Sequence, residues 1–203
     1  MRIATAAVLG ALLIGATAGA AKANVSCYAE ASAGKNITAT RVSDEIEGPV
    51  TLAADGLTGG LGFGCDAQLA DFNGFGAPVI GFLARYDWTD LKTAIGTDGK
   101  FSTDGMWSAA ARAGIKINPS VLVSGLAGIA GTELSYPGIE TDPTGILLGA
   151  GLELDIAVKN LTLFAEYSNI VWDKTKVADS ASQLRPDTDV FRVGLRLKFD
   201  LLK

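Results

Sequence analysis

The sequence lacks histidine, the residue on which much acid–base, nucleophilic and zinc chemistry depends. Cys27 and Cys65 are the two cysteines among its 203 residues. Without histidine, serine–histidine triads, histidine general bases and ordinary zinc sites are excluded. The sequence therefore predicts a protein that is not an enzyme and needs no metal ion and no cofactor.

Two other patterns could point to ligands, and a structural explanation is preferred for each. The run Gly60-x-Gly62-x-Gly64 suggests a phosphate loop, but its spacing is not the dinucleotide fingerprint and no helical pattern follows. Glycines crowded inside a small barrel explain it better. Four loop acids could bind a divalent cation, but they match no dedicated calcium loop and we expect them to be solvated. These acids are Asp98, Asp104, Glu140 and Asp142.

Many charged residues alternate with apolar residues at a period of two, as in a half-buried β-strand. In residues 189–199, for example, Phe191 and Val193 alternate with Arg192. Six acids and six bases lie opposite continuous aliphatic faces, and we expect them to pair inside a narrow barrel, although some near its mouths could be solvated. The twelve are Glu30, Asp66, Arg85, Asp87, Arg112, Lys116, Glu153, Asp155, Glu166, Arg192, Arg196 and Lys198.

The first 23 residues have the features of a cleaved export signal. Arg2 precedes a short apolar run over residues 6–18, and Ala21-Lys22-Ala23 is a cleavage pattern. A membrane anchor is the alternative, but the run is short and the cleavage pattern follows directly. Loss of Arg2 and Lys22 leaves 15 of the 17 cations against 22 acids, a formal charge of −7, so nucleic acid is not an expected partner.

The remaining residues, 24–203, are predicted to form one barrel domain. No run of eighteen uncharged apolar residues follows the leader, although 48% of the chain is hydrophobic. Eight alternating segments are found instead, at 25–35, 57–69, 79–88, 107–118, 121–132, 146–158, 161–168 and 189–199. The facing of the segment at 121–132 is left open because both of its sides are apolar.

The connections between these segments alternate between long and short. The long ones are 36–56, 89–105, 133–145 and 173–188. This asymmetry is typical of transmembrane barrels, with short periplasmic turns and long outer loops. A soluble barrel with an oily interior is disfavoured, because the charges lie opposite the aliphatic face. The predicted fold is all-β: an eight-stranded antiparallel up-and-down transmembrane β-barrel with a polar, side-chain-filled interior.

The aromatic residues are predicted to lie at the two membrane interfaces of this barrel. Several aromatic side chains should form an outer interfacial belt, and three should form the periplasmic one. The outer set is Tyr86, Trp88, Trp107, Tyr167 and Trp172, and the periplasmic set is Phe72, Phe75 and Phe199.

Cys27 and Cys65 fall on the same face of neighbouring strands, so either a disulfide or two free thiols facing lipid is expected.

The order of these features resembles the small outer-membrane β-barrel family of Gram-negative bacteria, the OmpA-like or opacity-antigen-like group often called "porin family". The likeness is carried by the leader, the eight segments, and the stretches at 107–114, 163–167 and 191–199. It implies outer-membrane localisation, contact with membrane lipid and lipopolysaccharide, and recognition by the barrel-assembly machinery. The implied assembly signal is Arg192, Gly194, Leu197 and Phe199. The chain departs from the family by continuing over residues 200–203, either as more strand or as a periplasmic tail.

The functional expectation is a non-enzymatic structural, surface-exposed barrel. Resemblance implies a role in envelope integrity, adhesion or antigenicity, with host or surface ligands contacting the loops. The alternative is a narrow porin or small-solute channel, which the balanced inner charges oppose. An enzyme is the third class, and the absence of histidine argues against it.

Overall fold

A computed structural model describes residues 24–43, 50–70, 74, 76–95, 99–136, 139–173, 175–176 and 183–202. Within these residues no helix has the length and apolar character needed to cross a membrane. The predicted leader, residues 1–23, lies outside the described residues.

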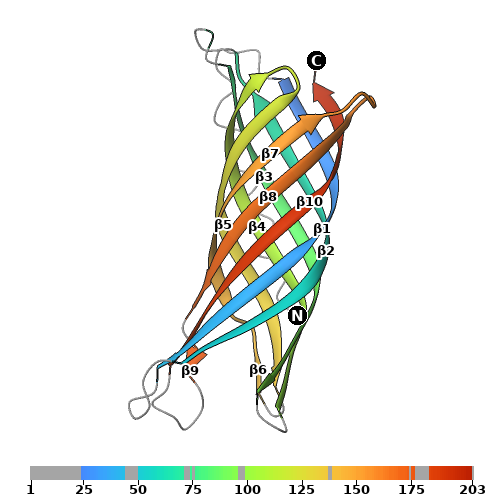
Figure 1. Ribbon diagram of the computed structural model, residues 1–203. Coiled ribbons are helices and arrows are strands. Elements are labelled where there is room, and N and C mark those ends of the chain that lie inside the picture. The colour runs from blue at the N-terminus through green and yellow to red at the C-terminus, as the bar shows by residue number, and fades with distance from the viewer. Residues whose placement is uncertain are drawn as a thin grey trace.

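Eight long strands form a closed barrel, so the predicted fold is confirmed (Figure 1). They are β1 (Asn24–Ser43), β2 (Val50–Gln68), β3 (Ala77–Ile95), β4 (Gly99–Asn118), β5 (Val121–Tyr136), β7 (Thr144–Asp155), β8 (Leu161–Trp172) and β10 (Gln183–Leu202). Each strand pairs antiparallel with its neighbour, and β1 pairs with β10 to close the barrel. The short strands β6 (Ile139–Thr141) and β9 (Thr175–Lys176) extend the hairpins by pairing with β5 and β10.

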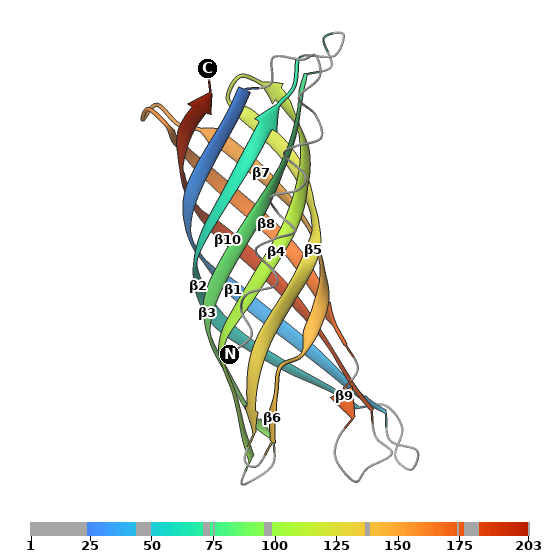
Figure 2. The ribbon, with the colours of Figure 1, turned by 180° about the vertical axis from the view of Figure 1, so that it is seen from behind.

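The two ends of the barrel differ. At the short-turn end lie the connections 69–76, 119–120 and 156–160, together with the C-terminus. Asn160 has φ 63° there, a left-handed conformation that asparagine tolerates and that lets β8 turn back against β7. The long-hairpin end carries β6 and β9, at the bottom of Figure 1 (and of Figure 2, which shows the barrel from behind).

The strands at the long-hairpin end are longer than predicted. Asn36 pairs with Gly56 and Val42 with Val50, so most of the predicted loop 36–56 is a paired hairpin. The predicted loops at 89–105, 133–145 and 173–188 are likewise shortened, because β3 continues to Ile95 and β10 begins at Gln183. The error arises because backbone pairing continues where the apolar alternation that reveals a strand has ended.

Apolar and polar side chains separate onto opposite faces of the wall. The large exposed hydrophobic residues, such as Leu61, Ile146 and Leu195, point outward, whereas the buried charged residues point into the barrel. The facing of β5, left open above, is settled: Leu122, Ser124 and Leu126 point inward. A barrel with this pattern exposes a continuous apolar surface and buries its charges.

Candidate functional site in the barrel interior

The inward charged side chains form one connected network, because alternate residues of each strand face the interior. All twelve of the charged residues predicted to face inward are buried or half-buried there. They come from seven of the eight barrel strands, β1 to β4, β7, β8 and β10. The network forms three layers that follow one another from the short-turn end toward the long-hairpin end.

The first layer, near the short turns, is partly open to solvent. Lys198 donates a hydrogen bond of 3.0 Å to Asp155, and Lys116 forms an ion pair of 3.3 Å with the same carboxylate. Thr162 donates to Asp155 at 2.7 Å. Lys198 also lies 3.6 Å from Glu153, which links this layer to the next one.

The second layer is buried and centres on Glu153. This carboxylate forms ion pairs with Arg112 and Arg196. Arg112 is also paired with Asp66 at 2.6 Å, and Arg196 with Glu30 at 2.8 Å. The side chains of these five residues are 8% exposed or less, so each charge depends on its partners rather than on water.

The third layer centres on Glu166. Arg85 binds this carboxylate with two nitrogen atoms, at 2.7 and 3.1 Å, and reaches Glu30 at 2.6 Å with its Nε. Arg192 lies 3.4 Å from Glu166 and pairs with Asp87 at 2.7 Å. Two-pronged contacts of this kind fix the guanidinium groups in orientation as well as in position.

Two aromatic rings hold Arg196 at the centre of the lumen. Its guanidinium carbon lies 4.8 Å from the ring centroid of Tyr28 and 4.3 Å from that of Phe164, distances typical of cation–π contacts. Glycine provides the space for both rings: a Cβ at Gly64 would lie 2.5 Å from Tyr28, and one at Gly194 would lie 2.7 Å from Phe164. Arg196 and the two rings that enclose it therefore fill this part of the lumen with side chains.

Toward the long-hairpin end, the inward side chains that the structure describes are neutral. Asn36 donates to Thr89 at 3.0 Å, and Trp172 donates to Thr188 at 2.9 Å. Leu147 and Ile170 belong to a buried apolar cluster. The charges thus occupy the middle and the short-turn end of the barrel, with an uncharged plug of side chains beyond them.

The sequence-based search missed several interior residues. Tyr28, Phe164, Ser124 and Ser168 contact the arginine side chains, and Ser168 accepts a hydrogen bond of 2.8 Å from Arg192. A sequence signal existed for three of them, since Tyr28, Phe164 and Ser168 each lie two residues from a charged inward residue of their own strand. Ser124 had no such signal, because it pairs with Gly114 and Gly151 on a strand whose two sides are both apolar.

Some predicted belt positions need correction. Tyr86, Trp88, Trp107 and Tyr167 point outward, but Trp172 is 6% exposed and points inward, so its predicted place in the belt is wrong. Ser168, Ile170 and Trp172 lie at every second position of β8 and are all buried, so the regular alternation of this strand places Trp172 on the inner side. Phe199 points outward, and Phe72 and Phe75 lie outside the described residues.

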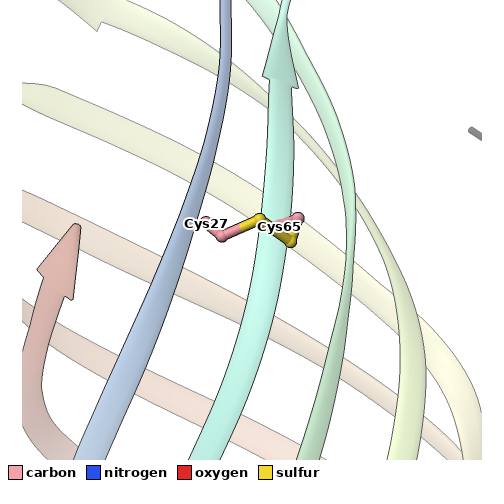
Figure 3. The surroundings of a disulfide bond; sticks show 2 residues. All are labelled: Cys27 and Cys65. Atoms are coloured by element: carbon pink, nitrogen blue, oxygen red, sulfur yellow. A yellow bond between two sulfur atoms is a disulfide. The ribbon is translucent and has the colours of Figure 1, made fainter. Parts of the chain in front are cut away.

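The two cysteines are joined. Cys27 and Cys65 stand opposite each other on β1 and β2 and form a disulfide, as Figure 3 shows. Of the two outcomes expected from sequence, the structure contains the bridge rather than the free thiols.

The C-terminal continuation extends the strand. Arg192, Leu197 and Phe199 of the predicted assembly signal alternate between the two faces of β10, and Gly194 packs against Phe164. Val25 pairs with Leu202, so the residues after Phe199 continue β10 as far as Leu202.

The described residues provide no additional chemistry for an ion site. Among them, no group of three acids, cysteines or histidines could hold a metal ion. Of the four loop acids considered above, Asp142 is exposed, Asp98 lies outside the described residues, and the side chains of Asp104 and Glu140 are not described. The inner carboxylates are engaged by arginine and lysine, an arrangement that neutralises charge and crosslinks strands.

Comparisons with known proteins identify the family. The model of the outer membrane protein beta-barrel domain matches residues 4–199. Among solved structures, Ail of Yersinia pestis, in complex with the heparin analogue sucrose octasulfate, is 18% identical, with 84% of this chain and 99% of Ail covered and a TM-score of 0.41. Neisserial surface protein A is 20% identical, with 85% and 97% covered and a TM-score of 0.48. The outer membrane protease OmpT of Escherichia coli is 7% identical, with 87% and 97% covered and a TM-score of 0.34.

The comparison with curated protein sequences found no match. The family model, however, covers nearly the whole chain and agrees with the closed barrel and its apolar outer face. The chain therefore belongs to the outer membrane protein β-barrel family and is located in the outer membrane of a Gram-negative bacterium.

Proposed function

We propose that the protein is a non-enzymatic structural barrel that presents its long hairpins at the cell surface, in a role in envelope integrity, adhesion or antigenicity. The observation that carries this proposal is the filled interior. Arg85, Arg192 and Arg196 are buried and paired with carboxylates from other strands, and Tyr28 and Phe164 enclose Arg196. An eight-stranded barrel has room for such side chains but not for a water-filled passage beside them.

The length of the strands supports surface presentation. About nine to eleven residues suffice for a tilted strand to cross a bilayer, whereas β1, β4 and β10 each have 20 residues. Trp88 marks the aromatic belt on β3, and the strand continues for seven more residues to Ile95, roughly 23 Å of extended chain. The long hairpins therefore stand clear of the membrane, where a ligand or an antibody can reach them.

Reconstituted protein is expected to conduct no ions. Because the arginine layers and the neutral plug fill the lumen, a planar bilayer containing the purified folded protein should stay at the background current. A porin reconstituted in the same bilayer serves as the positive control. Stable single-channel steps that are absent from mock-purified samples would contradict the structural role and favour the narrow-channel alternative.

An epitope placed between Ile95 and Gly99 is expected to be accessible on intact cells. The same epitope placed after Gly74 at the short-turn end should be labelled only after the outer membrane is permeabilised. Flow cytometry with one antibody measures both variants, and heat-modifiable gel migration checks that each is folded. Equal labelling of the two variants on intact cells would contradict the proposed orientation and surface presentation.

A further inference from the structure

The outer wall of the barrel carries a groove of about 480 Å³, a volume within the usual range for ligand sites. It runs across the outward faces of β1, β10, β8 and β7. Ala33, Ala165 and Ala150 form its floor, and the larger side chains of Tyr167, Phe191 and Leu152 stand around it. The groove lies on the apolar surface that faces lipid in the membrane.

The strand register explains why the groove forms here. Ala33 pairs with Val193, which pairs with Ala165, so two alanines flank one valine in a row across three strands. In the next row toward the cell surface, Phe191 pairs with Tyr167, and their ring centroids are 4.9 Å apart. The floor is low at Ala33 and Ala165 because alanine side chains are short, and the paired rings make a high wall over β10 and β8. Ala150 pairs with Tyr167, so it continues the floor onto β7 beside the rings.

The outer rim of the groove is polar. Asp189 accepts hydrogen bonds from the Tyr167 hydroxyl at 2.6 Å and from the Asn169 side-chain amide at 2.9 Å. Lys35 is paired with Phe191 in the register and forms an exposed ion pair of 2.8 Å with Asp55. From Lys35 on β1 to Asn169 on β8 the rim spans two strand spacings, about 10 Å.

The geometry points to an occupant, and we propose that the groove binds an acyl chain of a lipopolysaccharide molecule in the outer leaflet, with the phosphorylated amino-sugar headgroup on the polar rim. The site opens onto the bilayer in which the protein resides, so its occupant is a lipid. Lipid tails are as apolar as the wall, so burial of a chain by itself gives no preference among lipids. Selectivity must come from the shape of the groove and from the rim.

The rim fits a sugar headgroup better than a single phosphodiester. The Lys35 ammonium can donate to a phosphate, while the Asp189 carboxylate can accept from sugar hydroxyl and amide groups. A rim of about 10 Å with both kinds of group matches a headgroup that is two rings wide. The proposal rests on the proposed orientation, with the long hairpins outside the cell, and does not depend on whether the protein conducts ions.

Native mass spectrometry of the purified protein with added lipid A tests the site. The wild-type protein should retain one lipid A molecule and retain phosphatidylethanolamine of the same chain length at least tenfold less. Ala165→Phe, which fills the floor, should reduce lipid A retention at least tenfold. Ala111→Phe is the matched control, because Ala111 is also exposed on the lipid-facing wall but lies on β4, outside the groove. The Ala111→Phe variant should retain as much lipid A as the wild type does.

A second pair of variants keeps the test independent of folding. Ala150→Phe fills the floor from β7, and heat-modifiable migration identifies which of the filled variants are folded. Lys35→Gln should weaken lipid A retention severalfold without changing retention of phosphatidylethanolamine. The proposal is overturned if the wild type retains no lipid A, if it retains both lipids equally, if folded filled variants retain lipid A as the wild type does, or if a second copy of the chain occupies the groove.

Discussion

Replacement of Arg196 by glutamine is expected to lower the free energy of unfolding by about 3–5 kcal/mol, the usual cost of removing one partner from a buried charge network. Arg196 forms ion pairs with Glu30 and Glu153, and its removal leaves both carboxylates short of positive charge at a site where their side chains are almost fully buried. It also removes the cation held between Tyr28 and Phe164. Urea-induced unfolding in lipid vesicles, followed by tryptophan fluorescence, measures the loss.

Lys198→Gln provides the matched control on the same strand. Lys198 is bonded to Asp155 in the layer nearest the short turns, and its side chain is 23% exposed, so water can solvate what the substitution leaves behind. Its loss should cost no more than about 1 kcal/mol. If the two variants unfold at the same urea concentration, the buried layers contribute no more to the free energy of unfolding than the partly exposed first layer does. The stabilising role assigned to the buried network would then be wrong.

The second large effect is expected on the opposite face of the same strand. Leu195 points outward midway between Phe191, whose ring contacts the outer-belt residue Tyr167, and Phe199, which was predicted for the periplasmic belt. Leu195→Arg places a charge near the bilayer midplane and should destabilise the barrel by about 2–4 kcal/mol. Reversible unfolding from vesicles in urea or guanidinium measures this difference.

The control for this effect is a position at the outer interface. Leu57 is 75% exposed and pairs with Lys35 in the register, so a second cation at this depth can reach water and headgroups. Leu57→Arg should therefore cost about 0–1 kcal/mol. If the two arginine variants lose the same free energy of unfolding, the cost of a charge on the outer face does not depend on its depth in the membrane. The assignment of this face to lipid would then be wrong.

The alternation of side chains made the barrel predictable from sequence. Phe191, Val193 and Leu195 on one side and Arg192 and Arg196 on the other already separate the two faces of β10. Because a one-residue slip would reverse every side chain, parity alone places each charge inside or outside. The two-residue connection between the segments 107–118 and 121–132 was also predictable, since proline at position 119 favours a turn and turn chemistry is local.

Partners within the interior were not predictable in the same way. Parity says that Arg85 and Glu166 both face inward, but their contact depends on the tilt and stagger of strands that are 81 residues apart in sequence. The long hairpins were hidden for a different reason. Residues such as Asn36 and Thr38 lie in strands whose outer faces no longer need apolar side chains, so the periodic signal ends before the pairing does.

The groove could not have been read from the sequence at all. Ala33, Ala150 and Ala165 are far apart in the chain and are unremarkable small residues in three different strands. They become one floor because the closure between β1 and β10 brings the two ends of the chain together. Features of this kind depend on register across several strands, which local patterns do not contain.

The closing strand also balances the charges of the lumen in the part of the chain that the structure describes. Of the six inward cations, Arg192, Arg196 and Lys198 all belong to β10, whereas the six inward acids lie on other strands. Without β10, the inner face of the remaining sheet would carry three uncompensated carboxylates, which is unfavourable in a low-dielectric surrounding. Arrival of the last strand brings these twelve inward charges to a formal sum of zero. An unfinished barrel therefore differs from a finished one in the net charge of its inner face as well as in shape.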